Sequence, residues 1–282
     1  MRFEARESLG AALVYASVIL VAGSLGWLLW DVLGQGLPRL SWAYLSQAPE
    51  DAGRAGGIAP MLVSTLLILG VCMAVSLPLG LGAALWLSEV CRAGHPLARA
   101  LRRLLDVLAA TPSIVIGLFG NALFSKALGL GFSILAGGLT LACMVLPILI
   151  RTTEEAFSAV PPELRSAARA LALSQMRTLV QLLLPVALPG LMAGFLLGLG
   201  RALAETAALI FTSGYVDRMP ESLLDSGRAL SVHIYDLAMH VGGGEGAAYA
   251  AASTLILLIL LINALFLALA GLWRRRALRL VA

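Results

Sequence analysis

Charged side chains are scarce in this sequence, and their scarcity indicates which solvent surrounds the chain. Only 13% of the 282 residues are charged and 60% are hydrophobic, with a mean hydropathy of +0.92. An average soluble domain has about 25% charged residues. The apolar residues form long runs of mainly Leu, Ala, Val, Ile and Gly, unlike the alternating pattern of core strands. These runs predict membrane helices.

Cysteine and catalytic motifs are also missing or few. The three cysteines, Cys72, Cys91 and Cys143, are an odd number without the spacing of metal ligands, so neither a disulfide framework nor a zinc site is expected. The sequence has no GxxxxGK[ST] phosphate loop, so the chain is not expected to hydrolyse nucleotide. HExxH, GxSxG and CxxC are absent as well, which leaves a membrane enzyme without a visible catalytic set.

Six segments contain the roughly 20 apolar residues that a helix needs to cross the hydrocarbon core. The first is longer than a signal-peptide core and lacks a convincing cleavage site, so it is expected to be retained. Pro78 is expected to kink the second, and the third is expected to begin or break near Thr111-Pro112-Ser113. The segments are 11–33, 58–87, 107–129, 132–150, 189–212 and 249–272.

The sequence therefore predicts an all-α integral membrane protein with six transmembrane helices. We expect residues 1–57 to hold an N-terminal tail, the first helix and an outer segment, and residues 58–272 to form a five-helix core. Residues 273–282 are expected to form a basic tail. The surroundings of most of this chain would be membrane lipid.

The distribution of basic residues predicts the orientation. With a cytoplasmic N-terminus, fourteen arginines fall in inside segments, five basic residues fall outside, and Arg201 lies within a span. The positive-inside rule then places both termini in the cytoplasm. The net charge of +4 and the pI near 9.3 are explained by this asymmetry, and no nucleic-acid partner is expected.

One inside loop, 151–188, is longer than a simple connector and has a helical pattern of its own, which suggests a protein partner. Pro161-Pro162 followed by Glu163 can open a helix with an acidic first turn. Pro185 and Pro189 are expected to mark the turn back into the fifth span. Apolar and small residues recur at helical spacing through Leu164, Ala167, Ala168, Leu171 and Ala172.

Arg201 and Glu205 are four residues apart in the fifth predicted span, which would place them on one helix face where they can pair. Each costs roughly 2.5–3.5 kcal/mol at mid-bilayer, so both should face protein or water. A structural ion pair between helices, or an arginine that reaches a lipid headgroup, is the plainer explanation. A place in a translocation pathway is favoured because apolar sequence flanks Arg201 on both sides.

Small residues recur every four positions on the same helix, which allows another backbone to approach closely. The residues are Gly190, Gly194, Gly198 and Ala202. We interpret this stripe as a packing surface, suited to contact with a partner.

The chain resembles the second permease subunit of the phosphate-specific ABC importer family, over most of its length. Each matching motif is weak alone, but their order and spacing together are specific. They are Gly56-Gly57-Ile58 with Pro60, Leu77-Pro78-Leu79-Gly80, Leu87-Ser88-Glu89, Thr111-Pro112-Ser113-Ile114-Val115-Ile116-Gly117-Leu118, Ser133-Ile134-Leu135-Ala136-Gly137, Leu146-Pro147-Ile148-Leu149-Ile150-Arg151-Thr152-Thr153-Glu154-Glu155-Ala156, Leu184-Pro185, Leu188-Pro189-Gly190 and Gly198-Leu199-Gly200-Arg201-Ala202-Leu203-Ala204-Glu205-Thr206-Ala207.

This resemblance implies the type I (MetI-like) permease fold of ABC importers, in a bacterial inner membrane. It also implies a heterodimer with a homologous permease, two copies of a cytoplasmic ATPase that bind ATP and Mg, and a periplasmic phosphate-binding protein. No cofactor or metal is then expected in this chain. The loop 151–188 would be the coupling segment, whose short helix docks into a cleft of the ATPase.

The coupling segment departs from the family pattern, which reads Glu-Ala-Ala, three residues, Gly. This chain has Ser166-Ala167-Ala168 and then Ala172 at the glycine position. Serine cannot make the ionic contact of the glutamate, and Glu163, one turn earlier, is a candidate to substitute for it. Alanine is expected to favour continued helix over a left-handed turn. Arg165 completes the set of residues expected to couple to the ATPase.

Two alternatives to a phosphate permease stay open at this stage. One is an ABC permease for another oxyanion, such as phosphonate, molybdate or sulfate. The other is a membrane scaffold of a phosphate-sensing system that does not transport, which the altered coupling segment keeps open.

Overall fold

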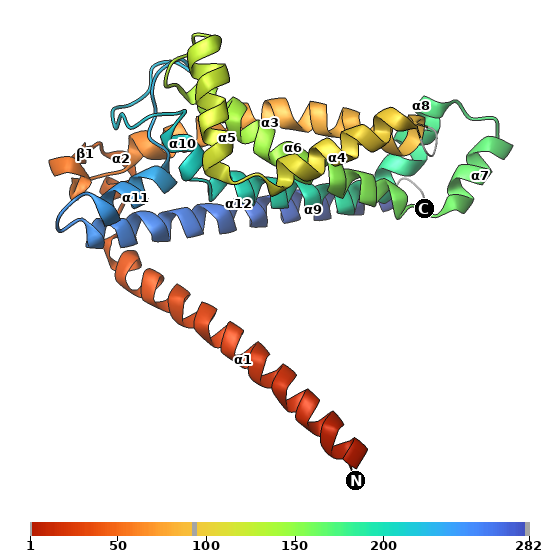
Figure 1. Ribbon diagram of the computed structural model, residues 1–282, viewed down its shortest axis with the longest axis horizontal. Helices are drawn as coiled ribbons and strands as arrows, with labels where there is room; N and C mark the ends of the chain where they lie inside the picture. The colour runs from red at the N-terminus through yellow and green to blue at the C-terminus, as the bar shows by residue number, and fades with distance from the viewer. Residues whose placement is uncertain (1, 92–94, 280–282) are drawn as a thin grey trace.

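A computed structural model describes the backbone of residues 2–91 and 95–279 and the side chains of 11–91, 95–268 and 271. The described chain is mostly helical (Figure 1). A long helix, α1 (Arg2–Gly36), leads into an outer segment of short elements. These are η1 (Leu37–Arg39), α2 (Trp42–Ser46), β1 (Pro49–Glu50), η2 (Asp51–Gly53) and β2 (Ala55–Gly56), in which β1 and β2 pair antiparallel.

The next elements form the first part of the bundle. They are α3 (Ala59–Leu85), the π-helical turn η3 (Trp86–Val90), α4 (Pro96–Ala110), α5 (Ser113–Gly120), the π-helical turn η4 (Asn121–Ala127) and α6 (Ile134–Ser158). The chain continues through α7 (Pro162–Ala170), α8 (Gln175–Arg177), the π-helical turn η5 (Thr178–Leu183), α9 (Leu184–Leu203), α10 (Ala207–Ile210), α11 (Leu230–Met239) and α12 (Glu245–Arg279). Residues 280–282 of the expected basic tail lie outside the described residues, and the backbone of 273–279 continues α12.

Five helical segments of the described chain are long and apolar enough to cross a membrane, and a bent pair makes a sixth if it counts as one span. The pair is Pro96–Ala110 with Ser113–Ala127, which meet at 105°. The break falls at Thr111-Pro112, as the sequence predicts, because a residue before proline is disfavoured in the helical region. Thr111 is accordingly extended, at φ −72° and ψ 130°. The third predicted span is therefore a bent pair.

The predicted bounds of the fifth span are wrong at both ends. One helical segment runs from Gln175 to Leu203, so Pro185 and Pro189 lie inside a helix instead of marking its start. The π-helical turn η5 directly precedes Pro185, and its altered hydrogen-bond register accommodates a residue that lacks a backbone donor. The connector between α6 and this segment is accordingly shorter than 151–188.

The core of the bundle lies where α3, α6 and α9 pack together. Buried residues from the three helices include Ile68, Cys72, Leu141, Val145 and Leu199. Glycines allow the helices to approach: a Cβ at Gly138 would lie 2.6 Å from the Cβ of Val71, and one at Gly198 would lie 2.8 Å from Cγ1 of Val145. The glycines thus set the spacing of these helices.

The two ends of the bundle differ in content (Figure 1). The outer segment and α11 lie at one end, which we call the α11 end, while α7 and α8 lie at the other, the α7 end. The helix α1 leaves the bundle at the α11 end and projects away from it. It is tied there to α12, where Tyr249 donates a hydrogen bond to Asp31 (3.2 Å) and Ser253 donates one to the carbonyl of Val32 (3.0 Å).

Candidate functional site

Arg201 lies in the last turn of α9, on the face that the rest of the chain leaves uncovered. The exposed positions Ala193, Leu197, Arg201 and Ala204 follow each other at helical spacing, and 42% of the Arg201 side chain is accessible. A guanidinium in an apolar helix requires a protein or water neighbour, so this face is a candidate for the wall of a polar path.

The small-residue stripe occupies another face of α9 and packs against α6 of the same chain. Gly190 lies against Ala156, Gly194 against Thr152 and Gly198 against Val145, so close that a Cβ at each glycine would collide. The packing interpretation of the stripe fits this contact, but the neighbour is α6 and not a partner subunit. The stripe thereby turns Arg201 away from the bundle.

Glu205 pairs with Arg201, although the two do not share one helix. The helix α9 ends at Leu203, and Glu205 lies in the break before α10, only 4% exposed. Its Oε2 accepts a hydrogen bond from Nη1 of Arg201, which completes the ion pair. Its Oε1 accepts a hydrogen bond from the backbone N–H of Ala208 (3.4 Å). The break itself is fixed by Ser231, whose hydroxyl donates to the backbone carbonyl of Glu205 (2.6 Å). The expectation of one continuous helix face is therefore wrong, while the pair itself is present.

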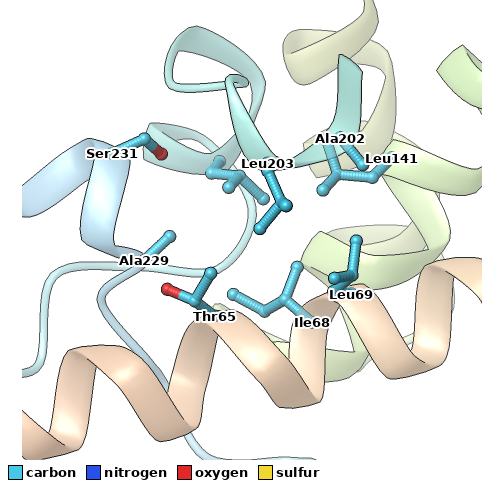
Figure 2. A pocket seen from close by; sticks show the side chains of 9 residues that line it. Thr65, Ile68, Leu69, Leu141, Ala202, Leu203, Ala229 and Ser231 are labelled. Carbon is cyan, nitrogen blue, oxygen red and sulfur yellow. The ribbon is translucent and has the colours of Figure 1, made fainter. Parts of the chain in front are cut away.

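The interior of the bundle beneath this break holds a very small cavity (Figure 2). Its volume is about 10 Å³, close to the least that can hold one water molecule. Apolar side chains from α3, α6 and α9 close it, with Thr65 and Ser231 as its polar members. Its lining consists of Thr65, Ile68, Leu69, Leu141, Ala202, Leu203, Leu209, Ala229 and Ser231. This cavity is too small to hold an oxyanion.

At the α7 end, the predicted short helix is present and begins where the sequence indicates. Pro161 caps α7, which starts at Pro162 with Glu163 in its first turn. Glu163, Ser166 and Ala167 are exposed, whereas Ala168 is buried against the bundle. The exposed residues therefore form the face available to a partner.

Arg165, placed by the sequence in the coupling set, points inward instead. Its Nη1 donates to the carbonyl of Val160 (2.9 Å) and its Nη2 to that of Phe157 (2.8 Å), at the end of α6. The same Nη2 lies 2.7 Å from Oε1 of Glu89, in the π-helical turn that follows α3. Arg165 thus joins α7 to the ends of two spans, while 29% of its side chain stays accessible.

Ala172 adopts the left-handed conformation that the sequence expectation ruled against. The helix α7 ends at Ala170, and Ala172 has φ +49°. The backbone N–H of Ala172 donates to the carbonyl of Arg169 (3.0 Å) and that of Leu173 to the carbonyl of Ala168 (3.0 Å). This is the Schellman pattern, with Ala172 at the position that glycine usually occupies. The expectation of continued helix is wrong because these two bonds satisfy carbonyls that the helix end would otherwise leave unpaired.

A second polar cluster, at the α11 end, is not among the residues that the sequence indicates. Arg228 is 13% exposed and donates from Nε to the carbonyl of Tyr215 (2.8 Å) and from Nη1 to Asp236 (3.1 Å). His233 in α11 is 1% exposed, 3.5 Å from the same Nη1. Burial, followed by the charge of Arg228, lowers the pKa of His233 to about 4. The short helix α11 has no long apolar run to signal it.

Comparison with known proteins relates this arrangement to a defined group. Residues 76–277 match the family model described as "Binding-protein-dependent transport system inner membrane component". The phosphate transport system permease protein PstA 1 of Mycobacterium tuberculosis is 32% identical over 271 residues, which cover 93% of this chain and 88% of that protein. The phosphate transport system permease protein PstA of Haemophilus influenzae is 35% identical over 201 residues, 71% of each chain.

A solved structure shares the fold at low sequence identity. It is a bacterial ABC transporter involved in the import of the acidic polysaccharide alginate, with 15% identity and a TM-score of 0.61. The match covers 94% of this chain and 95% of that chain. The arrangement of α3 to α12 is thus that of an ABC importer permease, as expected from the sequence.

Proposed function

Because the chain belongs to the family of binding-protein-dependent transport system inner membrane components, we propose that it is a permease subunit that forms half of a translocation path for inorganic phosphate. The observation that carries the proposal is Arg201, a guanidinium on the uncovered face of α9 with a buried carboxylate beside it. The substrate class follows the phosphate permeases that are 32–35% identical to this chain.

A second permease would complete the path along α9. The bundle interior holds only about 10 Å³ at the α9–α10 break, so the described residues leave no room for an oxyanion there. A homologous subunit facing α9 would enclose Arg201 between two protein surfaces, where a charge is stable in the membrane. The five-helix core 58–272 is proposed as the part that meets this subunit.

Arg201 and Glu205 together give the path a fixed positive charge that is partly compensated by a carboxylate. A guanidinium binds an oxyanion through paired N–H donors, and the bond is strong when both partners are charged. Glu205 compensates Arg201 while no anion is present, and its negative charge keeps phosphate from binding too tightly. An anion can therefore arrive and leave, as transport requires.

The α7 end is proposed as the docking point of a separate cytoplasmic ATPase. The exposed residues Glu163, Ser166 and Ala167 would contact it, with two ATPase copies holding ATP and Mg. Ala172 supports this role because it supplies the helix end usually made by glycine. A periplasmic phosphate-binding protein would deliver substrate at the α11 end. Both termini would be cytoplasmic; for the C-terminus this is supported by the end of α12, which lies at the same end of the bundle as α7 (Figure 1).

Replacement of Arg201 by glutamine tests the proposal directly. The Arg201→Gln complex is expected to assemble with its ATPase but to lose most phosphate uptake, roughly tenfold or more if one charge-assisted contact is removed. Arg177→Gln is the matched control, because Arg177 is exposed in the same helical segment but at the α7 end. Unchanged uptake in an assembled Arg201→Gln complex would show that the arginine is only structural.

The same assay separates the alternative functions. Phosphate uptake that is competed by sulfate, molybdate or a phosphonate more strongly than by phosphate itself would reassign the substrate. Stimulation of the ATPase by loaded binding protein is expected for a transporter. A scaffold that does not transport would show no stimulation.

A further inference from the structure

We propose that Arg165 and Glu89 form a positioning pair that carries movement of α7 to the end of the α3 segment. The proposal rests on the proposed function, in which α7 is the helix that an ATPase moves. Three elements meet at the Arg165 guanidinium: α7 itself, the end of α6 through Phe157 and Val160, and the turn after α3 through Glu89.

The Arg165–Glu89 pair is important because α7 makes few other contacts with the bundle. Ala168 is its one buried residue among the nine from Pro162 to Ala170, and Leu164 is only partly buried. A groove of about 470 Å³ lies beside α7, so side chains do not fill the space between α7 and the neighbouring turns. Glu89, Arg165, Ala168, Arg169, Met176 and Leu179 are among its lining residues. With so little apolar contact, the charged contacts of Arg165 hold α7 at its angle.

The two attachments of Arg165 differ in what they connect. The bonds to the carbonyls of Phe157 and Val160 join α7 to α6, the helix that precedes it directly in the chain. Movement of α7 would therefore reach α6 through the connecting backbone even without these two bonds. Glu89 lies 76 residues away in sequence and gives α7 a charged link to the α3 segment. Removal of Glu89 therefore leaves α7 attached to α6 and breaks its charged link to α3.

Glu89 lies at the end of the α3 segment. It belongs to the π-helical turn Trp86–Val90, which follows α3 directly. The α3 segment packs on α6, and α6 in turn contacts the small-residue face of α9. A shift of α7 that pulls on Glu89 therefore acts on the helices that back the Arg201 face.

The test compares Glu89→Ala with a matched control in the complete complex of permeases, ATPase and phosphate-binding protein. The control is Glu155→Ala, which removes the same negative charge from an exposed position near the end of α6, where the carboxylate has no ion pair among the described residues. For Glu89→Ala we expect intact assembly and stimulated ATP hydrolysis, with the phosphate imported per ATP hydrolysed reduced about tenfold. Glu155→Ala should keep the wild-type ratio.

Conservative variants and the remaining outcomes complete the test. Glu89→Asp, which keeps the charge, is expected to restore part of the ratio, and Glu89→Gln to restore less. A wild-type ratio in Glu89→Ala would overturn the proposal. Loss of assembly in Glu89→Ala would also overturn it, because the pair would then stabilise the fold and not the coupling. If loaded binding protein fails to stimulate ATP hydrolysis in the wild-type complex, the proposed function itself fails and this inference fails with it.

Discussion

The α7 end and the α11 end of the molecule each depend on one arginine, but the two arginines are used differently. Arg228 at the α11 end is nearly covered and joins the carbonyl of Tyr215 to Asp236 beside the buried His233. Arg165 at the α7 end joins carbonyls to a carboxylate in the same way, yet it borders an open groove. Similar bonds can therefore fix one end of the molecule and leave the other able to move.

Removal of Arg228 should have the largest effect on stability. Arg228→Ala leaves Asp236 without its cation and the carbonyl of Tyr215 without that donor, so we expect a loss of about 3 kcal/mol of unfolding free energy, typical for breaking a covered ion pair. Arg218→Ala is the control, since Arg218 is exposed and its nearest carboxylates are 3.9 Å away; its effect should be below about 0.5 kcal/mol. Thermal unfolding in detergent measures both. Equal effects would contradict the contrast between a fixed and an exposed arginine.

Acidification should weaken the α11 end through His233. The folded pKa is about 4, below the ordinary value of 6.5, because burial and Arg228 disfavour the charged ring. His233 in the unfolded chain therefore becomes protonated below about pH 6.5, whereas in the folded chain it becomes protonated only near pH 4. Stability is fully present above pH 6.5 and falls as the pH drops toward 4.

The expected loss from this histidine is about 2 kcal/mol between pH 7 and pH 5. His233→Asn should flatten the profile over that range, while Asp217 and Asp236, the neighbouring carboxylates, are present in both proteins. The measurement is unfolding free energy against pH for the wild type and the variant. Parallel profiles would show that His233 is not held neutral by the fold.

Ala172→Gly should give the smallest change and the opposite sign. An alanine at φ +49° costs about 1 kcal/mol that glycine avoids, so the variant is expected to stabilise the α7 end by about 0.5 kcal/mol after the added chain entropy of glycine. Ala170→Gly, at an exposed helical position two residues earlier, should destabilise it by about 0.5–1 kcal/mol. Hydrogen exchange of the α7 backbone resolves both. Destabilisation by Ala172→Gly would contradict the left-handed assignment.

The sequence predicts features whose cause is local. The long apolar runs predict the spans, Pro112 predicts the break after α4, and Pro161-Pro162-Glu163 predicts the start of α7. In each case the backbone conformation follows from the residue itself or from its neighbour, so no tertiary information is needed.

Features that depend on distant contacts were not predictable from the sequence. No glycine or proline marks the end of α9 at Leu203. The break there is held by Ser231, whose hydroxyl bonds to Glu205, 26 residues away in sequence. Near α10, the side chain of Asn121 in η4 donates to the carbonyl of Phe211 (2.6 Å). The pairing of Arg165 with Glu89 spans 76 residues. The sequence alone could therefore place Arg165 in the coupling set but could not show this contact. The sequence shows the small residues of the stripe on α9, but it does not show that their neighbour is α6.

The weak attachment of α1 has a consequence for how the protein is made. None of the apolar window of α1 is buried by the rest of the described chain, whereas 67% of that of α6 is. In lipid, an apolar helix forms all its backbone hydrogen bonds alone, and association with other helices is a later stage. We therefore expect α1 to insert and persist without helix partners during biosynthesis, while α6 gains its packing contacts only after α3 and α9 have joined it.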